Sequence, residues 1–134
     1  MAKSHWLRRD CHTLALSYRL CLNEREFKAE LKRLGIKQQI EFQKTYHSNA
    51  TTHFFENTEK LSAAAIVCMP IAKGKTLEQI NALLVHEAMH IWQEHCDKIG
   101  EKHPSSEFEA YAVQLISQEL MVSYRKQTKE RKRG

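Results

Sequence analysis

The sequence NALLVHEAMHIWQEHCDKIG, residues 81–100, decides how this chain is organised. Apolar residues recur through it and just before it at the three- and four-residue spacing of one helix face: Leu77, Ile80, Leu84, Ala88 and Ile91. Upstream, Thr76 and Gln79 have the spacing of an N-terminal capping box, and Gly100 is a typical helix stop. The sequence therefore predicts a long amphipathic helix over about residues 77–98.

Two histidines lie near the middle of this predicted helix, in the motif H-E-x-x-H. His86 and His90 are four residues apart, so their side chains are separated by only about 40° around the helix axis. Both imidazoles can therefore bind one metal ion, and catalytic zinc keeps a position open for water. Zinc lowers the pKa of such a water to about 7, and Glu87, beside His86, can accept its proton. We predict Zn²⁺ as the cofactor, His86 and His90 as ligands and Glu87 as the general base.

Two alternatives compete with this interpretation. The same spacing occurs in histidine pairs on a solvated helix face, and the chain has eight histidines. The context favours a metal site, because the motif follows the apolar run INALLV inside a strongly periodic helix.

The other alternative is a non-catalytic binding protein in which zinc ties two long helices together. Such structural sites are normally closed by four protein ligands and have no need of Glu87. Because we find no convincing fourth ligand, the sequence favours catalysis.

A third ligand must come from further along the chain. Cys96 stands where metzincins have their third histidine, but it stays on the helix about 9 Å beyond His90 and should not reach the ion. The remaining candidates are His103, Glu107 and Glu109, which lie beyond the helix stop. For Glu109 there is a competing role as capping-box partner of Ser106 at the start of a last helix.

The stretch EFEAY, residues 107–111, resembles the E-F-x-A-D segment of gluzincin metallopeptidases, which follows their H-E-x-x-H helix. The resemblance implies a small zincin-like metallopeptidase that cleaves peptide bonds, with Glu107 as the third zinc ligand. Tyr111 takes the place of the aspartate that orients a ligating histidine in that family. A tyrosine hydroxyl could do part of this, or could polarise a substrate carbonyl.

A second resemblance is to SprT-like proteases, which carry their third histidine in a loop before a final helix. It implies a DNA-associated protease with His103 as the ligand, although Pro104 stands where that family usually has glycine. More broadly, residues 77–124 resemble small H-E-x-x-H proteins encoded by phages and prophages.

The rest of the chain predicts an α+β domain. Residues 1–22 have apolar positions without strand-like alternation, which indicates a helix. Asn23 and Gly35 delimit a second short helix. Three segments are predicted as strands of a short, mostly antiparallel sheet: residues 36–47, residues 51–56 and the apolar run 63–70. The last of these is predicted as a buried or edge strand that could align an extended peptide. A final helix should begin near Ser106 and carry the third ligand.

Length, composition and charge limit the classes of protein to which the chain can belong. The 134 residues form a single domain, 1–134, and without a run of 18 apolar residues we expect no membrane partner. The N-terminus lacks a signal-peptide core, so we expect a cytoplasmic protein. The partner implied by the metallopeptidase resemblance is a peptide or protein substrate. The four cysteines form no C-x-x-C pair and are expected to be reduced core residues. Nearly the whole net charge of +5 lies in a basic, flexible tail, about 125–134. This tail could bind nucleic acid weakly, or be a solvated helix end.

Overall fold

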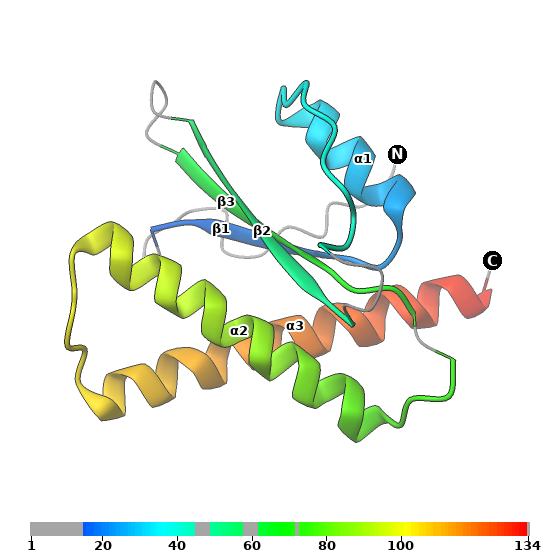
Figure 1. Cartoon of the computed structure of the whole chain (residues 1–134). Coiled ribbons are helices and arrows are strands. Elements are labelled where there is room, and N and C mark those ends of the chain that lie inside the picture. Colours follow the sequence, from blue (N-terminus) through cyan, green and yellow to red (C-terminus); the bar gives the residue numbers. More distant parts are fainter. Residues whose placement is uncertain (1–14, 45–48, 58–61, 72, 134) are drawn as a thin grey trace.

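The computed structural model describes residues 15–44, 49–57, 62–71 and 73–133, with side chains described as far as Lys129. Its elements follow the order β1 (Ser17–Cys21), α1 (Glu24–Arg33), β2 (Thr51–Asn57), β3 (Ser62–Cys68), α2 (Leu77–Ile99) and α3 (Ser106–Arg133). The chain is therefore an α+β domain, as the sequence predicts (Figure 1). The basic segment from Arg125 onward continues α3 as helix as far as Arg133.

The three strands form a mixed sheet in the order β1-β3-β2. β1 pairs with β3 in parallel, and β2 pairs with β3 antiparallel, so the expected mostly antiparallel sheet is corrected to a mixed one. The apolar run predicted as a buried or edge strand is β3, the central strand, and Ala65–Cys68 are all buried. The buried alternative is therefore confirmed for this strand, and the edge alternative is wrong, because β1 and β2 pair with β3 on its two sides. Of the two edge strands, β2 is the one beside α2, as the contacts described below show.

The first part of the chain differs most from expectation. Ser17–Cys21 is a strand, not part of a helix. The apolar residues of this strand do not alternate with polar ones because both faces of the strand are covered. Tyr18 and Leu20 belong to the core beneath α2 and α3, whereas Cys21 belongs to the cluster around Phe27 of α1. A strand buried on both faces loses the alternation of polar and apolar residues by which strands are recognised. Residues 1–14, including Cys11, lie outside the described part of the chain.

The short helix α1 matches its prediction. The Asn23 side chain accepts a hydrogen bond from the Glu26 backbone N–H at 2.8 Å, and Gly35 follows the C-cap with φ of +77°. The half-buried strand predicted at 36–47 is absent from its described part, 36–44, which is irregular chain. Its apolar side chains, Ile36, Ile40 and Phe42, pack on the α1 cluster without pairing to the sheet.

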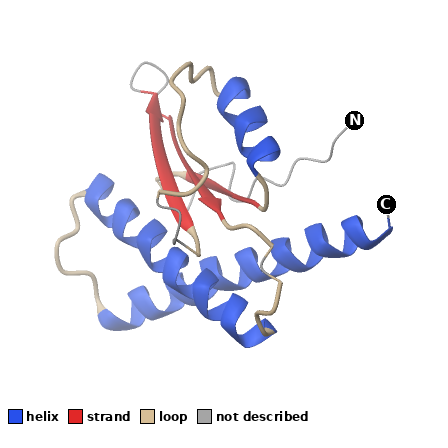
Figure 2. Cartoon of the chain, turned by 45° about the vertical axis from the view of Figure 1, so that its right-hand side comes forward, coloured by secondary structure: helices blue, strands red, loops and turns tan. Residues whose placement is uncertain are grey.

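Helices cover both faces of the sheet (Figures 1 and 2). α2 and α3 form a helical hairpin that packs on one face through a core that includes Leu20, Val67, Leu84 and Ile116. α1 covers the other face through a smaller cluster around Phe27. In the described residues, we find no helix with the length and apolarity that a membrane crossing needs.

Three of the four cysteines are described, and all three are free and buried: Cys21, Cys68 and Cys96. Cys21 and Cys68 are register partners on β1 and β3. Burial raises the pKa of Cys21 to about 12, which keeps its thiol protonated. These residues are small core side chains, as predicted.

Candidate metal centre

The helix that carries H-E-x-x-H forms as the sequence predicts. α2 begins with a complete capping box: the Thr76 side chain accepts from the Gln79 N–H, and the Gln79 side chain accepts from the Thr76 N–H. It ends at Gly100, whose φ of +73° favours glycine. His86 and His90 therefore lie one turn apart near the middle of a 23-residue helix.

The two histidines face each other on the exposed side of α2. Their Nε2 atoms are 3.2 Å apart and their ring centroids 4.9 Å apart. In a tetrahedral zinc site with Zn–N bonds of about 2.0–2.1 Å, two ligating nitrogens lie about 3.3 Å apart. Two imidazole nitrogens at this separation also need a shared proton or cation between them. The pair therefore fits two neighbouring ligands of one zinc ion.

Gln93 orients one of these imidazoles. Its Oε1 lies 3.3 Å from His90 Nδ1. A carboxamide oxygen only accepts hydrogen bonds, so this contact suits a neutral His90 with its proton on Nδ1 and an Nε2 lone pair that can bind a metal. Gln93 was not identified from the sequence. Its position three residues after His90 on the same helix was the available signal.

Glu87 lies on the flank of α2 that faces β2. Its side chain is buried, with only 4% of the residue exposed. The Thr52 hydroxyl on β2 donates a hydrogen bond to Glu87 Oε2 at 2.5 Å. Thr52 was not identified from the sequence, because 35 residues separate it from Glu87 and only the packing of β2 on α2 brings them together.

The proposed third ligands lie apart from the histidine pair. Glu107 is exposed in the first turn of α3, and His103 is exposed in the loop before it. Glu109 Oε2 accepts a hydrogen bond from Trp92 Nε1 at 2.8 Å, so it faces a core residue of α2. Within the described ranges, no three His, Cys, Asp or Glu side chains are grouped to hold a metal. The structure thus brings His86 and His90 together. Glu87 follows His86 in the sequence, and its carboxylate is bound to Thr52 on β2. None of the three candidate third ligands joins the histidine pair.

The start of α3 differs in detail from the sequence prediction. The Ser105 hydroxyl accepts from the Phe108 N–H at 3.2 Å, so Ser105 caps the helix in place of Ser106, the residue of the alternative capping box with Glu109. Tyr111, assigned from the family resemblance to a role beside the metal, is 66% exposed. Phe108 is 61% exposed, and its ring centroid lies 5.7 Å from that of Trp92 on α2.

Two further potential metal ligands on α2, His95 and Cys96, are buried. His95 is buried beside Trp92, and its Nδ1 accepts a hydrogen bond from the Ala15 N–H at 3.0 Å. Burial lowers the pKa of His95, because the charged imidazolium is disfavoured away from water. Cys96 is buried in the main core.

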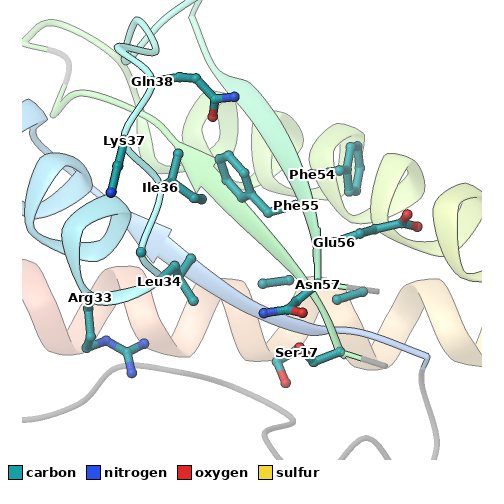
Figure 3. Close-up of a pocket in the computed structure, with 14 residues that line it drawn as sticks. Ser17, Arg33, Leu34, Ile36, Lys37, Gln38, Phe54, Phe55, Glu56 and Asn57 are labelled. Atoms are coloured by element: carbon teal, nitrogen blue, oxygen red, sulfur yellow. The ribbon is translucent and has the colours of Figure 1, made fainter. Parts of the chain in front are cut away.

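A separate hollow of about 1030 Å³ lies between the segment after α1 and the ends of β2 and β3 (Figure 3). Ile36 and Phe55 point toward one another across it. Neither histidine of the pair, nor Glu87 or Thr52, is among its described lining residues. The hollow is therefore distinct from the candidate metal centre.

Comparison with known proteins identified no matching family model, no similar curated protein and no similar solved structure.

Proposed function

We propose that this chain is a zinc-dependent hydrolase, a small metallopeptidase of the zincin type. The observation that carries the proposal is the 3.2 Å approach of His86 Nε2 and His90 Nε2, together with a buried glutamate, Glu87, at the next position of α2 after His86. Two imidazoles suit zinc, and a zinc site that only stabilises structure is normally closed by four protein ligands and does not require an adjacent glutamate.

Each residue of the candidate metal centre would have a separate role. His86 and His90 would hold the ion, and Gln93 would keep His90 in the tautomer that binds it. Bound zinc would supply a Lewis acid and lower the pKa of a water to about 7. Glu87 would accept the proton of that water and later donate it to the leaving nitrogen of the cleaved peptide.

For the third ligand we propose Glu107, on the strength of the EFEAY resemblance. Glu109 already accepts the Trp92 indole hydrogen bond, and His103 is held only by a connecting loop. Glu107 lies in the first turn of α3, on an element that packs against α2 through Ala112 and Ile116. It would have to approach the histidine pair when metal binds.

The test combines metal analysis with one substitution. We expect the purified chain to hold one zinc ion, and Glu87→Gln to retain the zinc and the fold while losing about 10²–10⁴-fold in hydrolysis of internally quenched peptides with randomised cores. Glutamine keeps the shape of the side chain but cannot accept the proton.

Glu94→Gln is the matched control, because Glu94 is another carboxylate of α2 and forms an ion pair with Lys98 at 3.6 Å. We expect it to hydrolyse peptides like the wild type. If Glu87→Gln also stays within a few-fold of the wild type, Glu87 is not the base.

A further inference from the structure

Glu87 is held by a strand that is distant in sequence. Of the acidic residues of α2, it is the buried one; Glu78 and Asp97 are exposed and Glu94 is half-buried. A buried carboxylate needs a hydrogen-bond donor to offset the loss of water, and the Thr52 hydroxyl on β2 supplies one.

We propose that Thr52 is a positioning residue that holds Glu87 in the orientation required of the general base. This inference rests on the proposed function and deepens it. A glutamate side chain has several rotatable bonds, and a base must lie within hydrogen-bond reach of the proton it takes. The hydrogen bond from Thr52 holds Glu87 Oε2. The other carboxylate oxygen, Oε1, is then the one that accepts the proton of the water.

The strand holds Thr52 firmly enough for this role. β2 pairs with β3 along its length, with Thr52 opposite Val67. Because side chains alternate along a strand, His53 points to the other face, where its ring stacks on Phe27 with centroids 5.0 Å apart. His53 Nε2 also lies 3.1 Å from the Phe42 carbonyl oxygen. The backbone of β2 is thus fixed on its far face while Thr52 reaches α2.

A second contact links β2 and α2. Glu56, four residues after Thr52 and on the same face of the strand, forms an ion pair with Lys98 near the end of α2. β2 is therefore tied to α2 at two places, and the hydroxyl of Thr52 is presented to Glu87 by a rigid element. Groups that orient a functional side chain from packed elements act more precisely than those on loops.

The experiment compares three substitutions on β2 in the zinc-loaded protein. Thr52→Val keeps the shape and strand preference but removes the hydroxyl, and we expect turnover to fall about 10–100-fold with KM and zinc content nearly unchanged. Thr52→Ser restores a hydroxyl and should recover most of the activity. Thr51→Val is the matched control, because the Thr51 hydroxyl accepts from the Lys44 N–H at 3.0 Å on the other face.

A measurement on the metal-free protein tests the contact independently of activity. We expect Thr52→Val to lower the midpoint of denaturant unfolding when Glu87 is present and to have little effect in a Glu87→Ala background, since the donor then has no carboxylate to hold. Thr52→Ala serves as a second hydroxyl-free variant. Equal effects in both backgrounds would show that Thr52 does not hold Glu87 and would overturn the inference.

The outcomes separate this inference from the proposed function. If the wild type hydrolyses peptides with zinc and Thr52→Val turns over equally fast, the positioning role is wrong and the hydrolase stands. If the wild type shows no zinc-dependent hydrolysis on the peptide mixture, the hydrolase proposal fails and the role of Thr52 in catalysis fails with it.

Discussion

At the scale of single residues, the candidate site depends on one property of the α-helix: side chains four positions apart return to the same side. This places His86 Nε2 and His90 Nε2 within 3.2 Å without help from the rest of the fold. We expect His86→Ala and His90→Ala each to abolish stoichiometric zinc, because each removes one of two imidazoles. Metal analysis of the purified variants measures this. Full zinc occupancy in either one would contradict the site.

The choice of third ligand is also decided residue by residue. We expect Glu107→Ala to weaken zinc binding strongly and His103→Ala to leave it almost unchanged, as titration with a zinc chelator can show. The reason is that Glu107 lies on a helix packed against α2, whereas His103 lies in the exposed loop before it. The reverse result would favour the SprT-like alternative. A loss for neither variant would direct attention to Glu109.

At the scale of elements, one buried ion pair docks α1 on the sheet. Arg19 on β1 and Glu30 on α1 are 7% and 8% exposed, and their side chains form a salt bridge. Removing Glu30 deprives the buried Arg19 of its closest partner and leaves it a longer ion pair with Glu26 at 3.8 Å. We therefore expect Glu30→Ala to lower the free energy of unfolding by about 1–3 kcal/mol, as chemical denaturation can measure.

The matched control is Glu24→Ala on the same helix. Glu24 forms an exposed pair with Lys28 at 3.2 Å, one turn along α1. Such surface pairs contribute about 0.3–0.5 kcal/mol. Similar losses for Glu30→Ala and Glu24→Ala would mean that the Arg19 pair does not hold α1 in place.

At the scale of the whole molecule, His95 connects the chain before β1 to the core of the helical hairpin. Its Nδ1 accepts the Ala15 N–H, and burial lowers its pKa in the folded state. The unfolded chain, where histidine titrates near 6.5, then binds the proton more readily than the folded one. The contribution of His95 to stability is therefore complete above about pH 6.5 and is lost as the pH falls from there toward the folded pKa.

We expect the free energy of unfolding of the wild type to fall more between pH 7.5 and 5.5 than that of His95→Asn. Asparagine can offer an oxygen acceptor to Ala15 but carries no titratable group. Denaturant unfolding at the two pH values makes the comparison. An equal fall in both proteins would show that His95 does not contribute to the pH dependence.

The sequence by itself determined the features that depend on neighbours along the chain. The limits of α2, its capping box, the short helix after Asn23, the start of α3 near Ser106 and the approach of His86 to His90 all follow from hydrogen bonds and periodicities spanning a few residues. The strand at 51–57 was also evident, because one of its faces is partly open and its composition is β-branched and aromatic.

Only the tertiary structure decided the features that join distant segments. Ser17–Cys21 forms a parallel pair with β3 across 47 positions of register, and a strand covered on both faces has no pattern that distinguishes it from a buried helix. The contacts of Thr52 with Glu87, and of Trp92 with Glu109, likewise depend on how β2 and α3 pack against α2. Local sequence determines which side chains share a helix face. The packing of helices and strands determines which hydrogen-bond donors and acceptors meet between two elements.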